Sequence, residues 1–279
     1  MADGTAVIPV GRHRLAATVI GDGTPAVVIE PAFGGYAGAW QSIAHRIADQ
    51  TTVVSYDRAP YGPSSPAADS RSPAEIAADL DELLGRLEIT GPVVLVGHSM
   101  GGVYARAFAS RNMGRVAGMV LVDSSHEGQF AVLPPLYSPK DRLLISLMVP
   151  QIIASTRKWR GGADRRSILR EYRTFRRLTA ADLPIGPGGL GERPLAVLTR
   201  GPEGKAEPDR LWQTWHGLQR ELAGLSENSR HVISDSPEHY LNEGDPDLIV
   251  SAVTDVVRCV RTGGRLGEAL AVAESPDGP

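Results

Sequence analysis

The most informative segment of the chain reads Pro92-Val-Val-Leu-Val-Gly97-His98-Ser99-Met100-Gly101-Gly102. It contains the pattern Gly-x-Ser-x-Gly, with Ser99 at its centre. An apolar, strand-like run (residues 93–96) leads into the pattern, and a helix-forming run (residues 104–110) leads out of it. A strand, a tight turn and a helix expose such a serine as a nucleophile, and the flanking glycines are needed because a β-carbon there would collide with backbone. Ser99 is therefore the candidate nucleophile.

His239 is the candidate general base. A serine hydroxyl is a weak nucleophile at neutral pH, so it needs a base within hydrogen-bond reach and an acid that orients this base. His239 follows the last strand-like run, residues 231–234, and precedes the last helical pattern, so we expect it at the mouth of the sheet. His98 lies beside Ser99 in the turn and is expected to pack or hydrogen-bond locally. The other five of the seven histidines have no comparable placement.

Strand-like and helix-like segments alternate over most of the chain. Residues 6–10 and 14–20 predict an opening antiparallel hairpin. Short runs that are almost wholly apolar are typical of parallel strands covered on both faces, and they occupy residues 26–29, 52–56, 93–96, 116–122 and 195–199. Ser72-Pro73-Ala74-Glu75 predicts a capped helix start, and Asp245-Pro246 predicts another. The alternation predicts an α/β fold with a mostly parallel central sheet flanked by helices.

The positions of the strand-like runs divide the chain into an expected core, an insertion and a tail. Residues 124–193 contain no strand-like run and are too long for a simple connection, so we expect a helical cap inserted after the sixth strand. The expected catalytic core then comprises residues 1–123 and 194–262. Residues 263–279 are rich in Gly, Ala and acidic groups and are expected to form a flexible tail.

Composition narrows the class of protein. A length of 279 residues, 42% hydrophobic residues and a net charge of −3 fit a globular chain and do not favour nucleic acid as a partner. The single cysteine, Cys259, can form neither an internal disulfide nor a cysteine-based zinc site, which favours a reducing compartment. The sequence shows neither a signal-like start nor an apolar run long enough to span a membrane. We therefore expect a cytoplasmic monomer or homodimer without a membrane partner.

Basic residues are concentrated in the expected cap. Residues 124–193 hold 12 basic and 6 acidic residues, a net charge of +6, whereas the remainder holds 17 basic and 26 acidic residues, a net charge of −9. One interpretation is a solvated helix face, or a cap held to an acidic core. The other is a local field that attracts an anionic acyl substrate, a coenzyme A thioester or an acidic carrier protein. Stacking aromatic residues do not accompany the arginines, so nucleic acid is the weaker reading.

Together these motifs resemble the α/β-hydrolases, and the resemblance runs in order over nearly the whole sequence outside the expected cap. Tyr56-Asp57-Arg58-Ala59-Pro60-Tyr61-Gly62 is similar to the family's loop after the fourth strand, with Pro60 in place of a glycine. The resemblance implies an α/β-hydrolase fold with the catalytic order serine, acid, histidine.

The resemblance also implies an oxyanion hole. Glu30-Pro31-Ala32-Phe33-Gly34-Gly35 lies where many members carry their oxyanion loop, although Pro-Ala replaces the usual His-Gly. The required donors are backbone N–H groups, which survive such side-chain replacements. By resemblance they belong to Phe33 and to Met100, the residue after the nucleophile. Glu30 is expected to pair with Arg58 or another base.

The acid has two candidates. In the commonest arrangement of the family it follows the next-to-last strand, here residues 195–199, and Glu203 is the nearby carboxylate. In other members it ends the preceding strand, and here Asp123 directly follows Val120-Leu-Val122. We favour Asp123 and keep Glu203 as the alternative.

Serine at the centre of the turn favours acyl chemistry. Dehalogenases and epoxide hydrolases of this family use an aspartate nucleophile, which Ser99 cannot replace. The resemblance therefore implies a serine hydrolase that cleaves an ester, lactone or thioester of a small to medium-sized organic substrate through an acyl-enzyme, without a metal or cofactor. The alternative is a cofactor-free lyase or cyclase, or a C–C bond hydrolase, that uses His239 and the oxyanion hole. The apolar runs Leu133–Tyr137 and Leu143–Ile153 are expected to line the acyl pocket.

Overall fold

A computed structural model describes residues 4–67, 71–140, 143, 147, 151, 165–203 and 210–266. Within these residues an eight-stranded sheet has the order β1-β2-β4-β3-β5-β6-β7-β8. Its strands are β1 (Thr5–Val10), β2 (His13–Ile20), β3 (Ala26–Glu30), β4 (Val53–Asp57), β5 (Val93–His98), β6 (Val116–Val122), β7 (Leu195–Thr199) and β8 (Ser229–Ile233). β2 pairs antiparallel with β1 and β4, and the other neighbours are parallel. This sheet confirms the predicted mostly parallel α/β fold.

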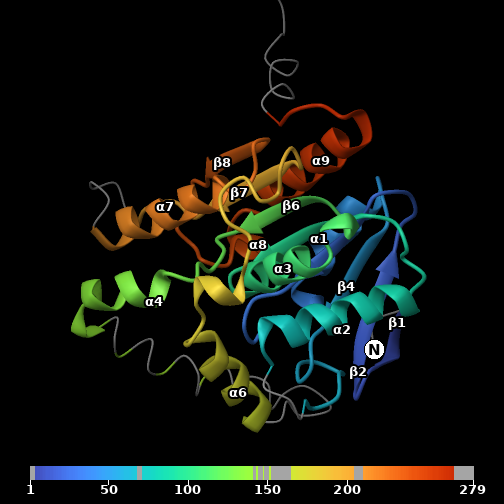
Figure 1. Ribbon diagram of the computed structural model, residues 1–279, viewed down its shortest axis with the longest axis horizontal. Coiled ribbons are helices and arrows are strands. Elements are labelled where there is room, and N and C mark those ends of the chain that lie inside the picture. The colour runs from blue at the N-terminus through green and yellow to red at the C-terminus, as the bar shows by residue number, and fades with distance from the viewer. Residues whose placement is uncertain are drawn as a thin grey trace, which may run out of the picture.

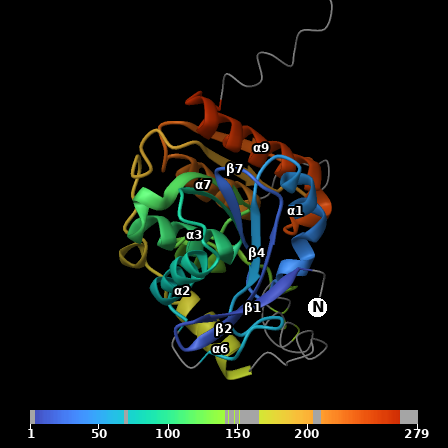
Figure 2. The ribbon, with the colours of Figure 1, turned by 90° about the vertical axis from the view of Figure 1, so that its right-hand side faces the viewer.

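Helices cover both faces of the sheet (Figures 1 and 2). The described α-helices are α1 (Gln41–Ala48), α2 (Pro73–Arg86), α3 (Met100–Arg111), α4 (Gln129–Val132), α6 (Arg165–Phe175), α7 (Arg210–Ala223), α8 (Leu241–Gly244) and α9 (Pro246–Thr262). The 3-10 helices are η1 (Ala37–Trp40), η2 (Met113–Arg115), η3 (Pro134–Leu136) and η4 (Ala180–Asp182). Figure 2 shows α2 and α3 on one side of the strands and α1 and α9 on the other.

Two apolar clusters form the core, one on each face of the sheet. Along β5, Val93 and Leu95 belong to the cluster under α2 and α3, while Val94 and Val96 belong to the cluster under α1 and α9. This alternation follows from the two-residue repeat of a strand, in which successive side chains point to opposite faces. Both faces are apolar because helices cover both, so the strand reads as an unbroken apolar run.

The predicted helix starts are confirmed by their caps. Ser72 Oγ accepts a hydrogen bond from the backbone N–H of Glu75, and the Glu75 carboxylate accepts one from the backbone N–H of Ser72. Asp245 Oδ1 accepts a hydrogen bond from the N–H of Leu248 at the start of α9. Such caps satisfy N–H groups that have no partner inside the helix. Among the described residues, none of the helices combines the length and hydropathy needed to cross a membrane.

Residues 124–193 contain α4, η3, α6 and η4. Leu133 packs against Trp215 and Leu218 of α7, and Ile168 of α6 joins the core cluster under α2 and α3. The expected apolar run Leu143–Ile153 lies almost wholly outside the described residues. In the expected tail, Leu266 is buried and its N–H donates to the Asn228 side chain, while residues 267–279 lie outside the described part of the chain.

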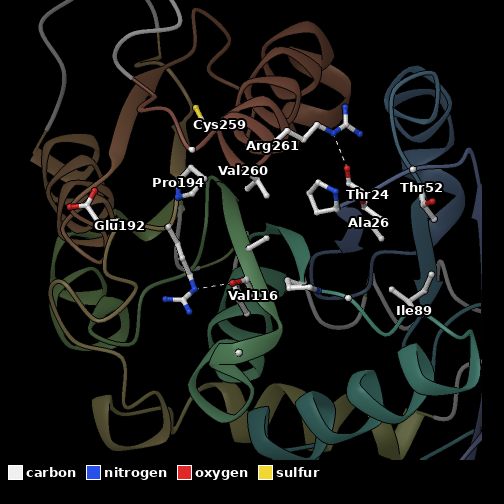
Figure 3. Close-up of a pocket in the computed structure, with 18 of the residues that line it drawn as sticks. Thr24, Ala26, Thr52, Ile89, Val116, Glu192, Pro194, Cys259, Val260 and Arg261 are labelled. Carbon is white, nitrogen blue, oxygen red and sulfur yellow. Dashed lines mark hydrogen bonds between the residues drawn. The ribbon is translucent and has the colours of Figure 1, made fainter.

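A cavity of about 1270 Å³ opens at the amino ends of the parallel strands (Figure 3). Its lining includes Pro25, Pro92 and Pro194, which stand at or just before the starts of β3, β5 and β7. The candidate residues Ser99 and Asp123 instead follow the carboxyl ends of β5 and β6. The cavity therefore lies at the edge of the sheet opposite to the candidate site.

Asp57, at the end of β4, should make the stability of the fold depend on pH. Its carboxylate accepts a hydrogen bond from the N–H of Ala37, 2.7 Å away. Burial raises the pKa of Asp57 to about 6, although this hydrogen bond and the charge of Arg58 oppose the rise. Because the raised pKa favours the protonated folded form, the stabilisation is present at low pH and is lost as the pH rises through 6.

Asp57→Asn removes this titration. We expect the free energy of unfolding of the variant, relative to the wild type, to increase by about 2 kcal/mol between pH of about 4 and pH of about 7. Urea unfolding of both proteins across this range measures the difference. A difference that stays constant with pH would contradict this account.

Candidate active site

Ser99 occupies the turn between β5 and α3 in a strained backbone conformation. Its φ is 53° and its ψ is −121°, a region that costs a non-glycine residue about 1 to 3 kcal/mol. The end of β6 and the segment after it hold this conformation. The N–H of Ser99 donates to the carbonyl oxygen of Val122 at 3.0 Å, and its carbonyl oxygen accepts from the N–H of Ser125 at 2.9 Å. The turn is thus fixed by backbone on both sides of the serine.

The glycines around Ser99 allow backbone segments to approach more closely than a β-carbon would permit. A β-carbon at Gly97 would lie 2.6 Å from the Cα of Gly102. A β-carbon at Gly101 would lie 2.0 Å from the carbonyl oxygen of Glu30 at the end of β3. These distances are far below van der Waals contact, so the predicted steric reason for both glycines is confirmed. They also show that the first turn of α3 presses against the loop after β3.

His239 lies between Ser99 and Asp123. Its Nε2 is 3.0 Å from Ser99 Oγ, and its Nδ1 is 2.6 Å from Asp123 Oδ2. The three residues follow β5, β6 and β8, whose carboxyl ends meet at one edge of the sheet. Asp123 is fully buried, while Ser99 and His239 remain partly exposed. This arrangement can move a proton from the serine hydroxyl to the imidazole while the carboxylate holds the ring.

Asp123 stays ionised because several donors surround it. Trp215 of α7 donates its indole N–H to Oδ1 at 2.7 Å, and the backbone N–H of Arg200 donates to the same oxygen at 3.2 Å. Burial by itself would raise the pKa of Asp123. The hydrogen bond and charge of His239, the charge of Arg200 and the indole of Trp215 outweigh burial and lower this pKa below its usual value. The carboxylate is therefore available to stabilise a protonated imidazole.

The structure separates the two candidate acids. Asp123 contacts His239, whereas Glu203, after β7, has an exposed side chain. Trp215 and Arg200 were not singled out from the sequence. Helix α7 showed an amphipathic pattern that could have located Trp215 on a buried face, but the pattern does not identify what that face contacts.

His98 holds the backbone of His239 by a hydrogen bond. Its Nε2 lies 2.9 Å from the backbone carbonyl oxygen of His239. Burial, followed by the neighbouring His239, lowers the pKa of His98 to about 3, so the ring is neutral at neutral pH. A neutral ring that carries its proton on Nε2 donates to that carbonyl oxygen. The predicted local hydrogen-bonding role of His98 is therefore confirmed, and the bond fixes the loop that carries His239.

The two candidate oxyanion donors follow neighbouring strands in register. Glu30 of β3 pairs with Gly97 of β5, so Phe33 and Met100 each stand three residues beyond this pair. Met100 is the first residue of α3, where N–H groups lack partners inside the helix, and the Ser99 side chain does not cap them. The expected ion pair beside this loop is also confirmed, with Arg58 Nη1 2.5 Å from Glu30 Oε1.

The short contact between His239 and Asp123 predicts a distinct proton resonance. A proton in a short, charge-assisted hydrogen bond is strongly deshielded, so we expect a signal for His239 Nδ1–H downfield of the amide region in ¹H NMR spectra. Asp123→Asn should remove this signal or shift it upfield. Glu203→Gln is the matched control and should leave it in place. The reverse pattern would assign the acid to Glu203.

Comparison with known proteins places this geometry in context. A family model described as the alpha/beta hydrolase fold matches residues 25–145. The uncharacterised protein YqjL of Bacillus subtilis is 24% identical over 233 residues, which are 82% of each chain. An esterase of Thermogutta terrifontis superposes with a TM-score of 0.68 at 21% identity, over 92% of this chain and 99% of that one.

Two further solved structures share the fold. The enol-lactonase of Burkholderia xenovorans LB400 has a TM-score of 0.67 at 20% identity, over 91% of this chain and 100% of that one. A Pseudomonas aeruginosa protein assigned as an epoxide hydrolase has a TM-score of 0.61 at 19% identity, over 92% of this chain and 96% of that one. Together with its sheet order and the strand–turn–helix at Ser99, these matches show that the chain has the α/β-hydrolase fold.

Proposed function

We propose that the protein is a serine hydrolase that cleaves an ester, lactone or thioester through an acyl-enzyme on Ser99. The observation that carries this proposal is the chain of hydrogen bonds from Ser99 Oγ to His239 at 3.0 Å and from His239 to the buried Asp123 at 2.6 Å. A serine with a base in hydrogen-bond reach, and a carboxylate that orients the base, is the arrangement needed for nucleophilic attack.

The proposed reaction has two steps. In the first, Ser99 Oγ attacks the acyl carbon while His239 Nε2 takes the hydroxyl proton, and the resulting imidazolium then protonates the leaving group. In the second, His239 takes a proton from the water that attacks the acyl-enzyme, and the imidazolium then returns a proton to Ser99 Oγ as the acyl–Oγ bond breaks and the acid is released. Asp123 stabilises the imidazolium in both steps. The N–H groups of Phe33 and Met100 stabilise the oxyanion, each contributing about 3 to 4 kcal/mol.

The nucleophile distinguishes acyl transfer from epoxide opening on this fold. An aspartate that attacks an epoxide forms an alkyl ester, which water can hydrolyse at its acyl carbon. Ser99 would form an alkyl ether, which has no acyl carbon and cannot be released in this way. The described activities of the esterase and the enol-lactonase are both acyl transfers, so these neighbours support the proposed class.

Covalent labelling tests the nucleophile. We expect a fluorophosphonate probe to label the wild type at Ser99 and not to label Ser99→Ala. Labelling of His239→Ala should be slower by about 10² or more, because the general base is lost. Ser110→Ala is the matched control on the same helix: the Ser110 hydroxyl donates to its own helix backbone, so labelling should match the wild type. Intact mass and peptide mapping measure the adduct.

The absence of labelling in the folded wild type would contradict acyl transfer. The remaining functions would then be a lyase or cyclase, or a C–C bond hydrolase, that uses His239 without an acyl-enzyme. Circular dichroism of each variant separates a lost nucleophile from a lost fold.

Arginines in α6 and directly after it are relevant to the charge of the proposed substrate. Arg170 donates to the carbonyl oxygen of Ala67 at 2.9 Å, and Arg176 stacks over the rings of Phe130 and Tyr172. The contact of Arg170 supports the interpretation that part of the basic charge holds the segment 124–193 to the core, whereas the contacts of Arg176 lie within the segment. Arg173 is exposed and, with Arg177, lines a surface cavity of about 360 Å³. Because such exposed arginines would attract negative charge, the proposed function includes a preference for an anionic acyl substrate.

Salt and Arg173→Ala test this preference. If the arginine field attracts the substrate, the KM for an anionic ester should rise with salt and in the variant, because screening weakens attraction between exposed charges. The KM for a neutral ester of the same size should stay constant. Equal behaviour of the two esters would remove the charge preference and leave the acyl chemistry intact.

A further inference from the structure

A buried cluster of charges lies beside the oxyanion loop, and the reaction proposed above does not use it. It consists of Arg58 after β4, Glu30 at the end of β3 and Glu171 of α6. Arg58 is 2% exposed, and both glutamates are 0% exposed. Three tyrosine hydroxyls complete it: Tyr56 donates to Glu30, and Tyr61 and Tyr104 donate to Glu171.

Arg58 also donates to the backbone of the loop itself. Its Nη1 lies 2.7 Å from the carbonyl oxygen of Pro31, and its Nη2 lies 2.9 Å from the carbonyl oxygen of Ala32. The guanidinium is planar and rigid, so it fixes two acceptors at once in a way that a lysine ammonium does not. Both carbonyl groups belong to the two residues that immediately precede Phe33.

This contact, together with the hydrogen bond that the N–H of Gly35 donates to the Ala32 carbonyl oxygen at 3.0 Å, fixes the direction of the Phe33 N–H. The peptide unit that joins Ala32 to Phe33 is planar, and in the trans form its C=O and N–H point in opposite directions. A guanidinium that holds the Ala32 carbonyl on one side therefore turns the Phe33 N–H to the other side. The Pro31 carbonyl, held by the same guanidinium, fixes the preceding peptide unit in the same way.

We propose that Arg58 is a positioning residue of the oxyanion hole, and that Glu171 of α6 holds Arg58 in place. The proposal rests on the proposed function, because it assigns the Phe33 N–H to the oxyanion. Glu171 Oε1 lies 3.4 Å from Arg58 Nη2, and its two oxygens accept from Tyr104 at 2.9 Å and from Tyr61 at 2.7 Å. Segment 124–193 thereby contributes Glu171, which acts on the oxyanion loop through Arg58.

The stability of the fold alone does not explain why these charges are buried. Burying charges costs free energy, and apolar residues of similar volume often stabilise a fold as well as a buried ion pair does. Burial opposes the charge of Arg58, but Glu30 and Glu171 outweigh it and raise the pKa of the guanidinium, so Arg58 keeps its charge.

A second contact joins the loop after β3 to α6: the rings of Phe33 and Tyr172, the neighbour of Glu171, lie 5.7 Å apart.

A trifluoromethyl ketone tests this role directly, because it adds to an active-site serine and leaves the former carbonyl oxygen in the oxyanion hole. With a ¹³C label at the carbonyl carbon, the ¹³C shift against pH gives the titration midpoint of that oxygen. We expect the wild-type adduct to be ionised at neutral pH. In Arg58→Lys the midpoint should rise by about one pH unit or more, a tenfold weaker preference for the oxyanion. Glu171→Gln should shift it in the same direction by less.

Arg71→Lys is the matched control. Arg71 is 1% exposed and pairs with Asp79 at 2.8 Å, and it precedes α2 rather than following β4 as Arg58 does. It should lower the Tm and leave the midpoint at the wild-type value. If Arg58→Lys does not fold, Glu171→Gln decides, and an unchanged midpoint overturns the proposal. A wild type that forms no adduct at Ser99 overturns the proposed function and this inference with it.

Discussion

The close approach of α3 to the end of β3 is the constraint on which the rest of the site depends. A β-carbon at Gly101 would lie 2.0 Å from the carbonyl oxygen of Glu30, so glycine alone lets the helix begin this near to the neighbouring strand. The same turn forces Ser99 to a positive φ and projects its side chain from the sheet edge. His239 and the loop after β3, which holds the candidate oxyanion donor Phe33, can then come close together, because both follow strands that end at this edge.

Two buried charge clusters flank the place where Ser99, His239 and the loop after β3 come together. On one side, Asp123 is kept ionised by His239, Trp215 and Arg200. On the other, Arg58 is held between Glu30 and Glu171. Both clusters place a charge in the interior, where it is costly unless every neighbour is a matching donor or acceptor. In each cluster, hydrogen bonds made by the charged group also fix a backbone segment or a ring of the candidate site.

Local patterns predicted the elements that depend on nearby residues. The strand, turn and helix around Ser99, the capping box at Ser72 and the placement of His239 could all be read from neighbours in the sequence. The choice between Asp123 and Glu203 remained open, because each carboxylate follows a strand and only the relative positions of these strands separate them. The structure places Asp123 beside the imidazole and leaves Glu203 exposed.

Sequence patterns could not predict contacts between elements that are distant in the sequence. Trp215 reaches Asp123 across 92 positions and Glu171 reaches Arg58 across 113 positions, so each contact depends on how α7 and α6 pack. The surplus of basic residues in segment 124–193 suggested a solvated helix face as one interpretation. That interpretation does not hold for Glu171, which is buried, while Arg173 in the same helix is exposed.

The acyl-enzyme is the central claim, and rapid-quench mass spectrometry with a slowly deacylated activated ester tests it most directly. The account predicts an early burst of leaving group, matched by one acyl increment on the intact chain that maps to the peptide containing Ser99. The increment should be absent in Ser99→Ala. Steady hydrolysis by the folded wild type without a burst and without an acylated Ser99 would contradict the account.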